Sequence, residues 1–184
     1  MNRTEGRRDG LVTASPGFVA DAMVGKLARW LRLTGADVLY NASWDDRELL
    51  AIARRGGRVL LTRDVPLASG SGEPRRLLVE SDDFREQLVQ VVTACGLDPW
   101  KGLLTRCMDC NSTLRPALRE EARQKVPPYV FSTQDGFKWC PQCDKMLWHG
   151  THSHEILTLF SELFRASAVQ GRLGGSRSGS ESRT

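Results

Sequence analysis

Short apolar runs alternate with amphipathic segments along the first part of the chain. The runs with the length of buried strands cover residues 18–23, 37–40, 58–62 and 76–80. The segments whose apolar side chains recur at helical spacing cover residues 24–34, 45–55 and 83–95. Strands that alternate with helices are typical of a parallel sheet with helices packed on both faces. The pattern therefore predicts an α/β domain with three layers.

Residues that favour turns separate these segments. Gly35 and the pair Gly56-Gly57 stand where two of the helices should end, because glycine readily adopts the left-handed conformation that follows many helices. Residues 66–74 are rich in Pro, Gly and Ser, which predicts a loop before the fourth strand.

Composition places most of the net charge of +4 outside the predicted domain. Residues 1–17 carry three Arg against one Glu and one Asp, and residues 166–184 carry three Arg against one Glu. Net charge therefore does not by itself indicate a nucleic-acid partner. The Gly-, Ser- and Arg-rich end of the chain cannot bury enough apolar surface to fold. We predict a disordered arm at 1–16 and a disordered tail at 166–184.

Two CxxC pairs, Cys107/Cys110 and Cys140/Cys143, follow the predicted α/β domain. Each such turn brings two thiolates together, and two turns complete the tetrahedral four-thiolate set that suits structural zinc. The 29 residues between the pairs exceed the usual gap of a zinc ribbon, which predicts an inserted hairpin or loop. The alternatives are two disulfides or a dithiol redox site. No signal peptide or membrane-spanning apolar run is evident, so we expect a reducing cytoplasm, which favours zinc.

Acidic residues follow the predicted strands. Asp21 lies near the end of the first strand, Asp64 just past the third, and Asp82 and Asp83 just past the fourth. Asp46 lies at the start of a predicted helix, and its side chain could reach the carboxyl ends of these strands. The carboxyl ends of parallel strands share one edge of a sheet, where ligand sites form. Carboxylates that converge there repel each other unless a hard cation lies between them, although each acid alone could simply cap a helix.

A basic stripe and two tryptophans are candidates for contacts with nucleic acid. Lys26, Arg29 and Arg32 share one face of the first predicted helix, where they could bind phosphates or form an ordinary solvated surface. Trp139 and Trp148 beside the second cysteine pair could stack on bases or form the small core of the zinc module. The sequence contains no Walker loop and no Rossmann glycine fingerprint.

Taken together, these segments resemble the Mut-seven C-terminal RNase family, in which a PIN-like domain precedes a zinc ribbon. The matching stretches are FVADAMVGKLARWLRLTGADV at 18–38, DDRELL at 45–50, GRVLLTRDVPLA at 57–68, RCMDCN at 106–111 and CPQCDKMLWHGTH at 140–152. The resemblance implies a PIN-like nuclease domain at 17–103 and a zinc ribbon with a C-terminal helix at 104–165.

The resemblance also implies roles for individual residues. Asp21, Asp46 and Asp64 would bind the catalytic Mg²⁺ or Mn²⁺ of an RNA-hydrolysing site. Asp82 or Asp83 would be the fourth acid, and Asp45 stays an alternative to Asp46. The residues that would bind zinc are Cys107, Cys110, Cys140 and Cys143.

The sequence thus predicts a cytoplasmic, metal-dependent ribonuclease that cleaves single-stranded RNA or structured RNA loops, in an endonucleolytic manner. The first alternative is a non-catalytic RNA- or protein-binding module built around the zinc ribbon, in which the acids only cap helices. A second is another Mg²⁺-dependent phosphohydrolase that uses the same edge of the sheet.

Overall fold

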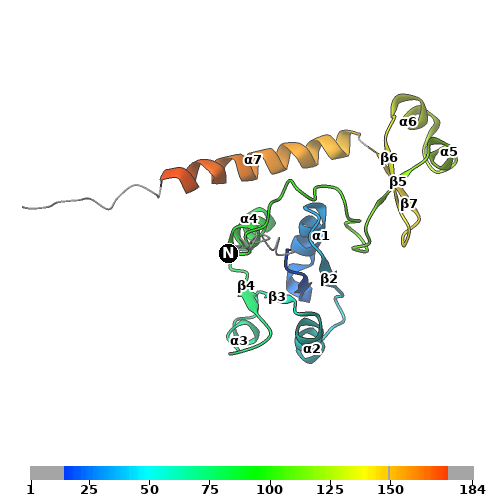
Figure 1. Ribbon diagram of the computed structural model, residues 1–184. Coiled ribbons are helices and arrows are strands. Elements are labelled where there is room, and N and C mark those ends of the chain that lie inside the picture. The colour runs from blue at the N-terminus through cyan, green and yellow to red at the C-terminus, as the bar shows by residue number, and fades with distance from the viewer. Residues whose placement is uncertain (1–14, 149, 174–184) are drawn as a thin grey trace, which may run out of the picture.

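A parallel sheet, a small antiparallel sheet and a long C-terminal helix make up the computed structural model, which describes residues 15–148 and 150–173 (Figure 1). The parallel strands are β1 Phe18–Ala20, β2 Val38–Tyr40, β3 Val59–Thr62 and β4 Arg76–Leu78. They lie in the order β2-β1-β3-β4, and Phe18 of β1 is in register with Val38 and Val59. This sheet confirms the predicted fold class.

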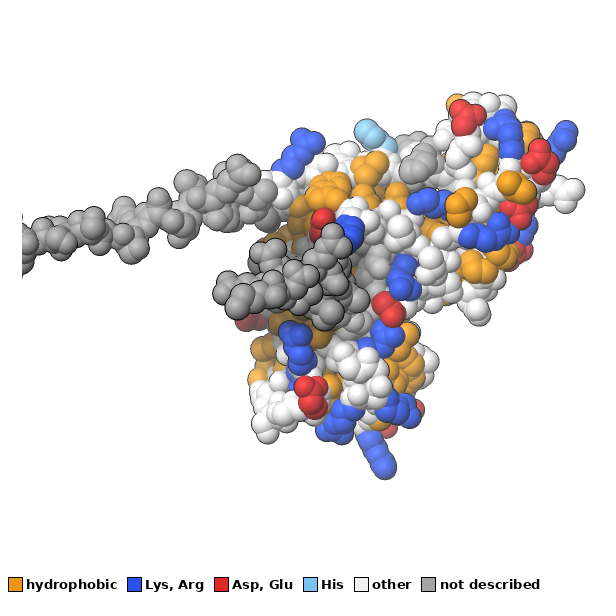
Figure 2. Space-filling view, viewed as in Figure 1, with side chains coloured by type: hydrophobic (Ala, Val, Ile, Leu, Met, Phe, Trp, Pro, Cys, Tyr) orange, Lys and Arg blue, Asp and Glu red, His pale blue; other side chains and the backbone are white. Residues whose placement is uncertain are grey.

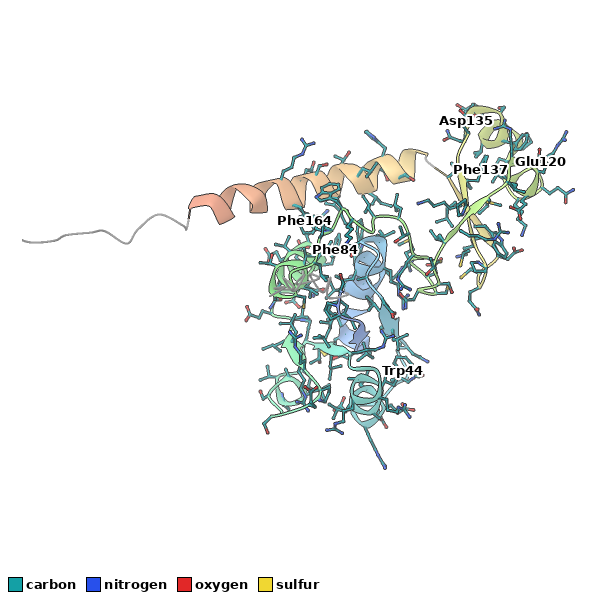
Figure 3. All side chains as sticks on the ribbon, viewed as in Figure 1. Trp44, Phe84, Glu120, Asp135, Phe137 and Phe164 are labelled. Atoms are coloured by element: carbon teal, nitrogen blue, oxygen red, sulfur yellow. The ribbon has the colours of Figure 1, made fainter. Side chains whose placement is uncertain are left out.

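Helices cover both faces of the parallel sheet. They are η1 Ala22–Val24, α1 Gly25–Leu33, α2 Asp46–Gly56, α3 Val65–Ala68 and α4 Phe84–Ala94. Because side chains alternate along a strand, Phe18 and Ala20 join the core beneath α1 and α4, whereas Val19 joins the core beneath α2 and α3. Trp44 borders the second of these cores (Figure 3). The loop predicted at 66–74 begins later in the structure, because helix α3 extends to Ala68.

The antiparallel sheet carries the cysteine pairs and is called the ribbon module here, residues 104–148. Its strands are β5 Arg115–Ala117, β6 Phe137–Cys140 and β7 Lys145–Trp148, in that order. The predicted inserted hairpin or loop is wrong in detail, because two short helices, α5 Arg119–Ala122 and α6 Pro128–Thr133, fill the segment. Their apolar side chains bury a separate small core with Phe137 (Figure 3).

Helix α7, Thr151–Leu173, runs from the ribbon module back across α4 (Figure 1). Phe160 and Phe164 are buried in the core beneath α1 and α4, and the Phe160 ring lies 6.1 Å from that of Trp30. The helix extends past residue 166, where the disordered tail was predicted to begin. Residues 174–184 of that tail and 1–14 of the predicted arm lie outside the described residues. No helix in the described ranges has both the length and the apolar character to cross a membrane.

Candidate active site and metal centre

The strand order places the switch point of the sheet at the carboxyl ends of β1 and β3. The chain leaves β1 toward β2 on one side, and β3 lies on the other side of β1, so the connections diverge between these two strands. In open α/β sheets, ligands bind at such a switch point. Asp21 directly follows β1, Thr62 ends β3, and Asp64 comes two residues later. The fold therefore brings these three side chains to the position where a ligand is expected.

A chain of hydrogen bonds joins the two acids through Thr62. The Thr62 hydroxyl donates to Oδ2 of Asp21 and accepts from the backbone N–H of Asp64 at 2.9 Å. Oδ1 of Asp21 accepts from the N–H of Met23, and Oδ1 of Asp64 accepts from the N–H of Leu67 at 2.7 Å. Both carboxylates are thus fixed at helix starts, and Asp21 is buried with 6 % of its surface exposed.

Thr62 is a candidate site residue that was not predicted from the sequence. Its side chain is fully buried at the end of an otherwise apolar strand. A buried hydroxyl needs hydrogen-bond partners, and here both partners belong to the acids of the site. The signal in the sequence is a polar side chain that interrupts a buried apolar run, two residues before an Asp.

Asp45 and Asp46 differ in how much of their carboxylate remains available. Asp45 is the N-cap of α2: its Oδ1 accepts from the N–H of Glu48 at 2.8 Å, and the Glu48 side chain returns a bond to the N–H of Asp45. Asp46 is exposed in the first turn and makes no side-chain hydrogen bond or ion pair with any described residue. Of the two acids, Asp46 is therefore the one whose carboxylate is free to bind a ligand.

Asp82 and Asp83 each have a local partner. Asp82 is 88 % exposed and pairs with the guanidinium of Arg63, the residue between Thr62 and Asp64. Asp83 caps α4 by accepting from the N–H of Arg85 at 2.8 Å. Nε of Arg63 is buried and has no acceptor among the described residues. The Arg63 side chain thus places a positive charge at the acid edge.

Within the described ranges, one group of His, Cys, Asp or Glu side chains brings three or more ligand atoms within 4.8 Å of one another, and it consists of Cys107, Cys110, Cys140 and Cys143. The carboxylates at the sheet edge do not meet that distance. The structure therefore assembles Asp21 and Asp64 through Thr62, but it does not draw three or four acids into one tight cluster.

The side chains of the predicted basic stripe on α1 already have partners within the protein. Lys26 Nζ lies 3.9 Å from the ring centroid of Phe84, and Arg29 pairs with Asp109 of the ribbon module at 2.8 Å. Both side chains still reach the surface. Their proposed contact with substrate would compete with these partners.

Arg32 instead holds the ribbon module against the parallel domain. The residue is 3 % exposed, and its guanidinium donates to the carbonyl oxygens of Val38, Met108 and Asp109 at 3.0, 3.0 and 2.7 Å. This burial leaves no surface for a phosphate, so a structural role replaces the predicted substrate contact. Desolvation also lowers the pKa of Arg32.

Other polar contacts complete the interface between the ribbon module and the amino-terminal end of β2. The Asn111 side chain accepts from the N–H of Val38 at 3.1 Å and donates to Asp37 at 2.7 Å. The segment that leads into the module also approaches closely: Gly35 has a φ of 87°, and a Cβ there would lie 2.4 Å from the carbonyl oxygen of Gly102. The module therefore docks at the sheet edge opposite the acids.

The four cysteine sulfurs have the spacing of a metal site rather than of disulfides. The Sγ atoms of Cys107 and Cys143 are 4.0 Å apart, and those of Cys110 and Cys140 are 3.4 Å apart. Four sulfurs at about 2.3 Å from a tetrahedral zinc ion are separated by roughly 3.8 Å, which lies between these two values. None of the four cysteines forms a disulfide in the structure, which therefore does not support the disulfide alternative. The cluster fits zinc.

Neighbouring thiols shift one another's ionisation in this cluster. Burial opposes ionisation of Cys110, but hydrogen bonds from Ser112 and from the thiols of Cys143 and Cys140 lower its pKa to about 6. The hydrogen bond to Cys110, together with burial, raises the pKa of Cys143 to about 12. Burial likewise raises the pKa of Cys140. Without a metal, the thiol of Cys110 therefore loses its proton at lower pH than the thiols of Cys140 and Cys143 do.

Zinc binding at pH 7 is expected to release at least two protons, because Cys140 and Cys143 have raised pKa values and must both become thiolates. The apparent affinity should then fall at least about 100-fold for each unit by which the pH decreases, since each released proton contributes a factor of ten. Calorimetric titration of zinc in buffers of different ionisation enthalpy measures the proton count. An affinity that does not change between pH 6 and 8 would contradict a thiol site.

The tryptophans of the ribbon module pack against its core. Trp139 donates from Nε1 to Asp144 at 2.7 Å, and the guanidinium of Arg115 lies 4.1 Å from its ring centroid. Trp139 and Trp148 both pack on the core of the ribbon module. The core alternative for these residues therefore describes the structure better than base stacking does.

Comparison with known proteins identifies one family. The sequence model described as the Mut7-C RNAse domain matches residues 16–160, a span that includes the parallel sheet and the cysteine cluster. Neither a curated protein nor a solved structure matches the chain. The family resemblance stated from the sequence is confirmed.

Proposed function

Because this chain belongs to the Mut7-C RNAse domain family, we propose that it is a metal-dependent ribonuclease whose active site lies at the carboxyl ends of β1 and β3. The observation that carries this proposal is the hydrogen-bond chain from Asp21 through Thr62 to Asp64. The Thr62 hydroxyl binds the carboxylate of Asp21 and the backbone N–H of Asp64, which supports both acids at the switch point of the sheet. Ligands bind at such points, and carboxylate oxygens are the ligands that Mg²⁺ and Mn²⁺ prefer.

Each charged residue at this edge of the sheet has its own role in the proposal. Asp21 and Asp64 would hold the ion, and Asp46 would add its free carboxylate. A divalent ion there would stabilise the negative charge that develops on the phosphate and make bound water more acidic. Arg63 adds a guanidinium that can pair with a phosphate oxygen in place of Asp82, because charged hydrogen bonds to phosphate are strong and directional. Asp83 then acts as the cap of α4.

In this proposal the ribbon module has a structural role and is not the main RNA-binding surface. Most of its basic side chains have partners within the protein: Arg106, Arg115, Arg119, Lys125, Lys138 and Lys145. Figure 2 shows acidic and basic side chains interleaved over this part of the surface. A module that binds RNA by charge would instead present unpaired cations on one face. This arrangement weighs against the alternative of a non-catalytic binding module.

Cleavage of a circular single-stranded RNA tests the activity and its mode together. A circle has no ends, so its conversion to a linear product requires endonucleolytic cleavage. We expect linear product with Mn²⁺ or Mg²⁺ and none with EDTA, and no cleavage of a DNA circle of the same sequence. Degradation of linear RNA with intact circles would retain the ribonuclease and overturn the endonucleolytic mode. No cleavage of either RNA would overturn the proposed function.

Thr62→Val is expected to weaken both the site and the fold. Valine keeps the shape of threonine but leaves the N–H of Asp64 without its acceptor and Asp21 without its donor, which costs about 1–3 kcal/mol of stability. Loss of this support should lower the cleavage rate roughly 10- to 100-fold, the usual effect of removing a group that orients a metal ligand. Denaturant unfolding and rate measurements check both effects.

Thr62→Ser is the matched control, because serine restores the hydroxyl without the methyl group. It should recover most of the activity. If valine and serine lower the rate equally, the hydrogen-bond chain does not orient the acids.

A further inference from the structure

A cavity of about 580 Å³ lies where the ribbon module, the end of α1 and α7 meet. Its apolar walls include Leu33 of α1, Leu104, Leu147 and Trp148 of the ribbon module, and Ile156 of α7. Cavities of this size with mostly apolar walls, at the junction of separate parts of a fold, commonly bind small molecules. The acids of the proposed active site do not line it, so it is a separate site.

Both charged side chains among the described residues that line this cavity are cations. They are Arg106 and Lys138, and none of the described lining residues is Asp or Glu. Lys138 Nζ donates to the carbonyl oxygen of Leu104 at 2.7 Å, which uses one of its three protons. Arg106 donates from Nε to Gly35 and from Nη1 to Asn111, which leaves the N–H groups of Nη2. The two cations that line this apolar cavity therefore keep N–H donors that these bonds do not use.

We propose that this cavity binds a small amphipathic anion: an apolar body of medium-chain length with one carboxylate head. The leucine, methionine and aromatic walls bury the body, and the head pairs with Lys138 and Arg106. A neutral molecule would leave the partly buried Lys138 ammonium with only a carbonyl oxygen as its partner, whereas an anion gains a charge-assisted hydrogen bond.

Such a ligand would hold three parts of the chain together. Its walls come from α1, the ribbon module and α7, so each bound molecule contacts all of them. Ligands that bind only the assembled state stabilise it by mass action. The ligand is therefore expected to raise the temperature at which the ribbon module separates from the parallel domain.

The probe for this site is 1-anilinonaphthalene-8-sulfonate, which has an apolar aromatic body and one anionic group. Its fluorescence with the zinc-loaded protein should saturate at one molecule per chain. Decanoate should displace it, and decanol at the same concentration should not. Lys138→Met should weaken binding about tenfold, because it removes a charge-assisted hydrogen bond but keeps a side chain of similar length. Lys101→Met, an exposed lysine outside the cavity, is the matched control and should change nothing.

A second variant guards against an effect of Lys138 on folding. Leu114→Trp adds volume to the cavity wall without changing charge and should also reduce probe binding at least tenfold. Circular dichroism and zinc content verify that each variant is folded. The proposal is overturned if no saturable site exists, if Leu114→Trp binds the probe as tightly as the wild type, or if decanol displaces it as well as decanoate.

Discussion

Asp21→Asn is expected to reduce RNA hydrolysis about 1,000-fold while the protein stays folded. A metal-binding carboxylate contributes several kcal/mol of transition-state stabilisation, and each 1.4 kcal/mol is a factor of ten in rate. Asparagine is as good an N-cap as aspartate, so the bond from the N–H of Met23 is kept. The cleavage rate of the circular RNA in Mn²⁺, with wild type and variant purified in parallel, measures the loss.

Asp45→Asn is the matched control for this experiment. It makes the same chemical change near the same edge of the sheet, but at a residue whose carboxylate caps α2. We expect activity within a few-fold of the wild type. Equal losses in the two variants would show that surface charge, and not a specific ligand, is responsible. Full activity in Asp21→Asn would remove Asp21 from the site.

Loss of zinc is expected to unfold the ribbon module and to leave the parallel sheet intact. Structural zinc in small modules contributes about 10–16 kcal/mol of binding free energy, which is folding free energy for the module. Cys140→Ser, or chelation of the wild type, should therefore expose the amides of residues 104–148 to hydrogen exchange. The amides of β1 and β3 should remain protected, because their cores lie beneath helices of the parallel domain.

The parallel domain should still lose some stability when the ribbon module unfolds. Arg32 would lose the carbonyl groups of Met108 and Asp109, which leaves a buried charge with fewer partners. Cys95→Ser is the control, because Cys95 lies outside the cluster and borders the core of the parallel domain. It should retain one zinc ion per chain by elemental analysis. A wild-type protein that lacks zinc, or a Cys140→Ser variant with unchanged hydrogen exchange, would contradict the zinc account.

The alternation of strands and helices was sufficient to predict the parallel domain. The central strands β1 and β3 are buried throughout, so their apolar runs are continuous, and the position of Asp64 follows from where the second run ends. Asp21 lies within the predicted run 18–23, because β1 ends at Ala20, earlier than predicted. The CxxC pairs likewise specified the cysteine cluster, because two such turns have few other uses in a reducing compartment.

The parts that could not be predicted depend on contacts between distant segments. Arg32 is at a helical position that suits a solvated face, and only the docking of Met108 and Asp109 buries it. The insertion between the cysteine pairs contains Pro127 and Pro128, which concealed the helix that begins there. Asp45 and Asp46 are adjacent carboxylates, and the capping bond to Glu48 is what separates their roles.

Metal binding at the acid edge is the central claim, and an anomalous-difference map of crystals soaked in Mn²⁺ tests it most directly. The account predicts a manganese peak between the carboxylates of Asp21 and Asp64, together with a separate zinc peak among the four cysteine sulfurs. An ordered acid edge without manganese, in crystals whose cysteine site contains zinc, would contradict it.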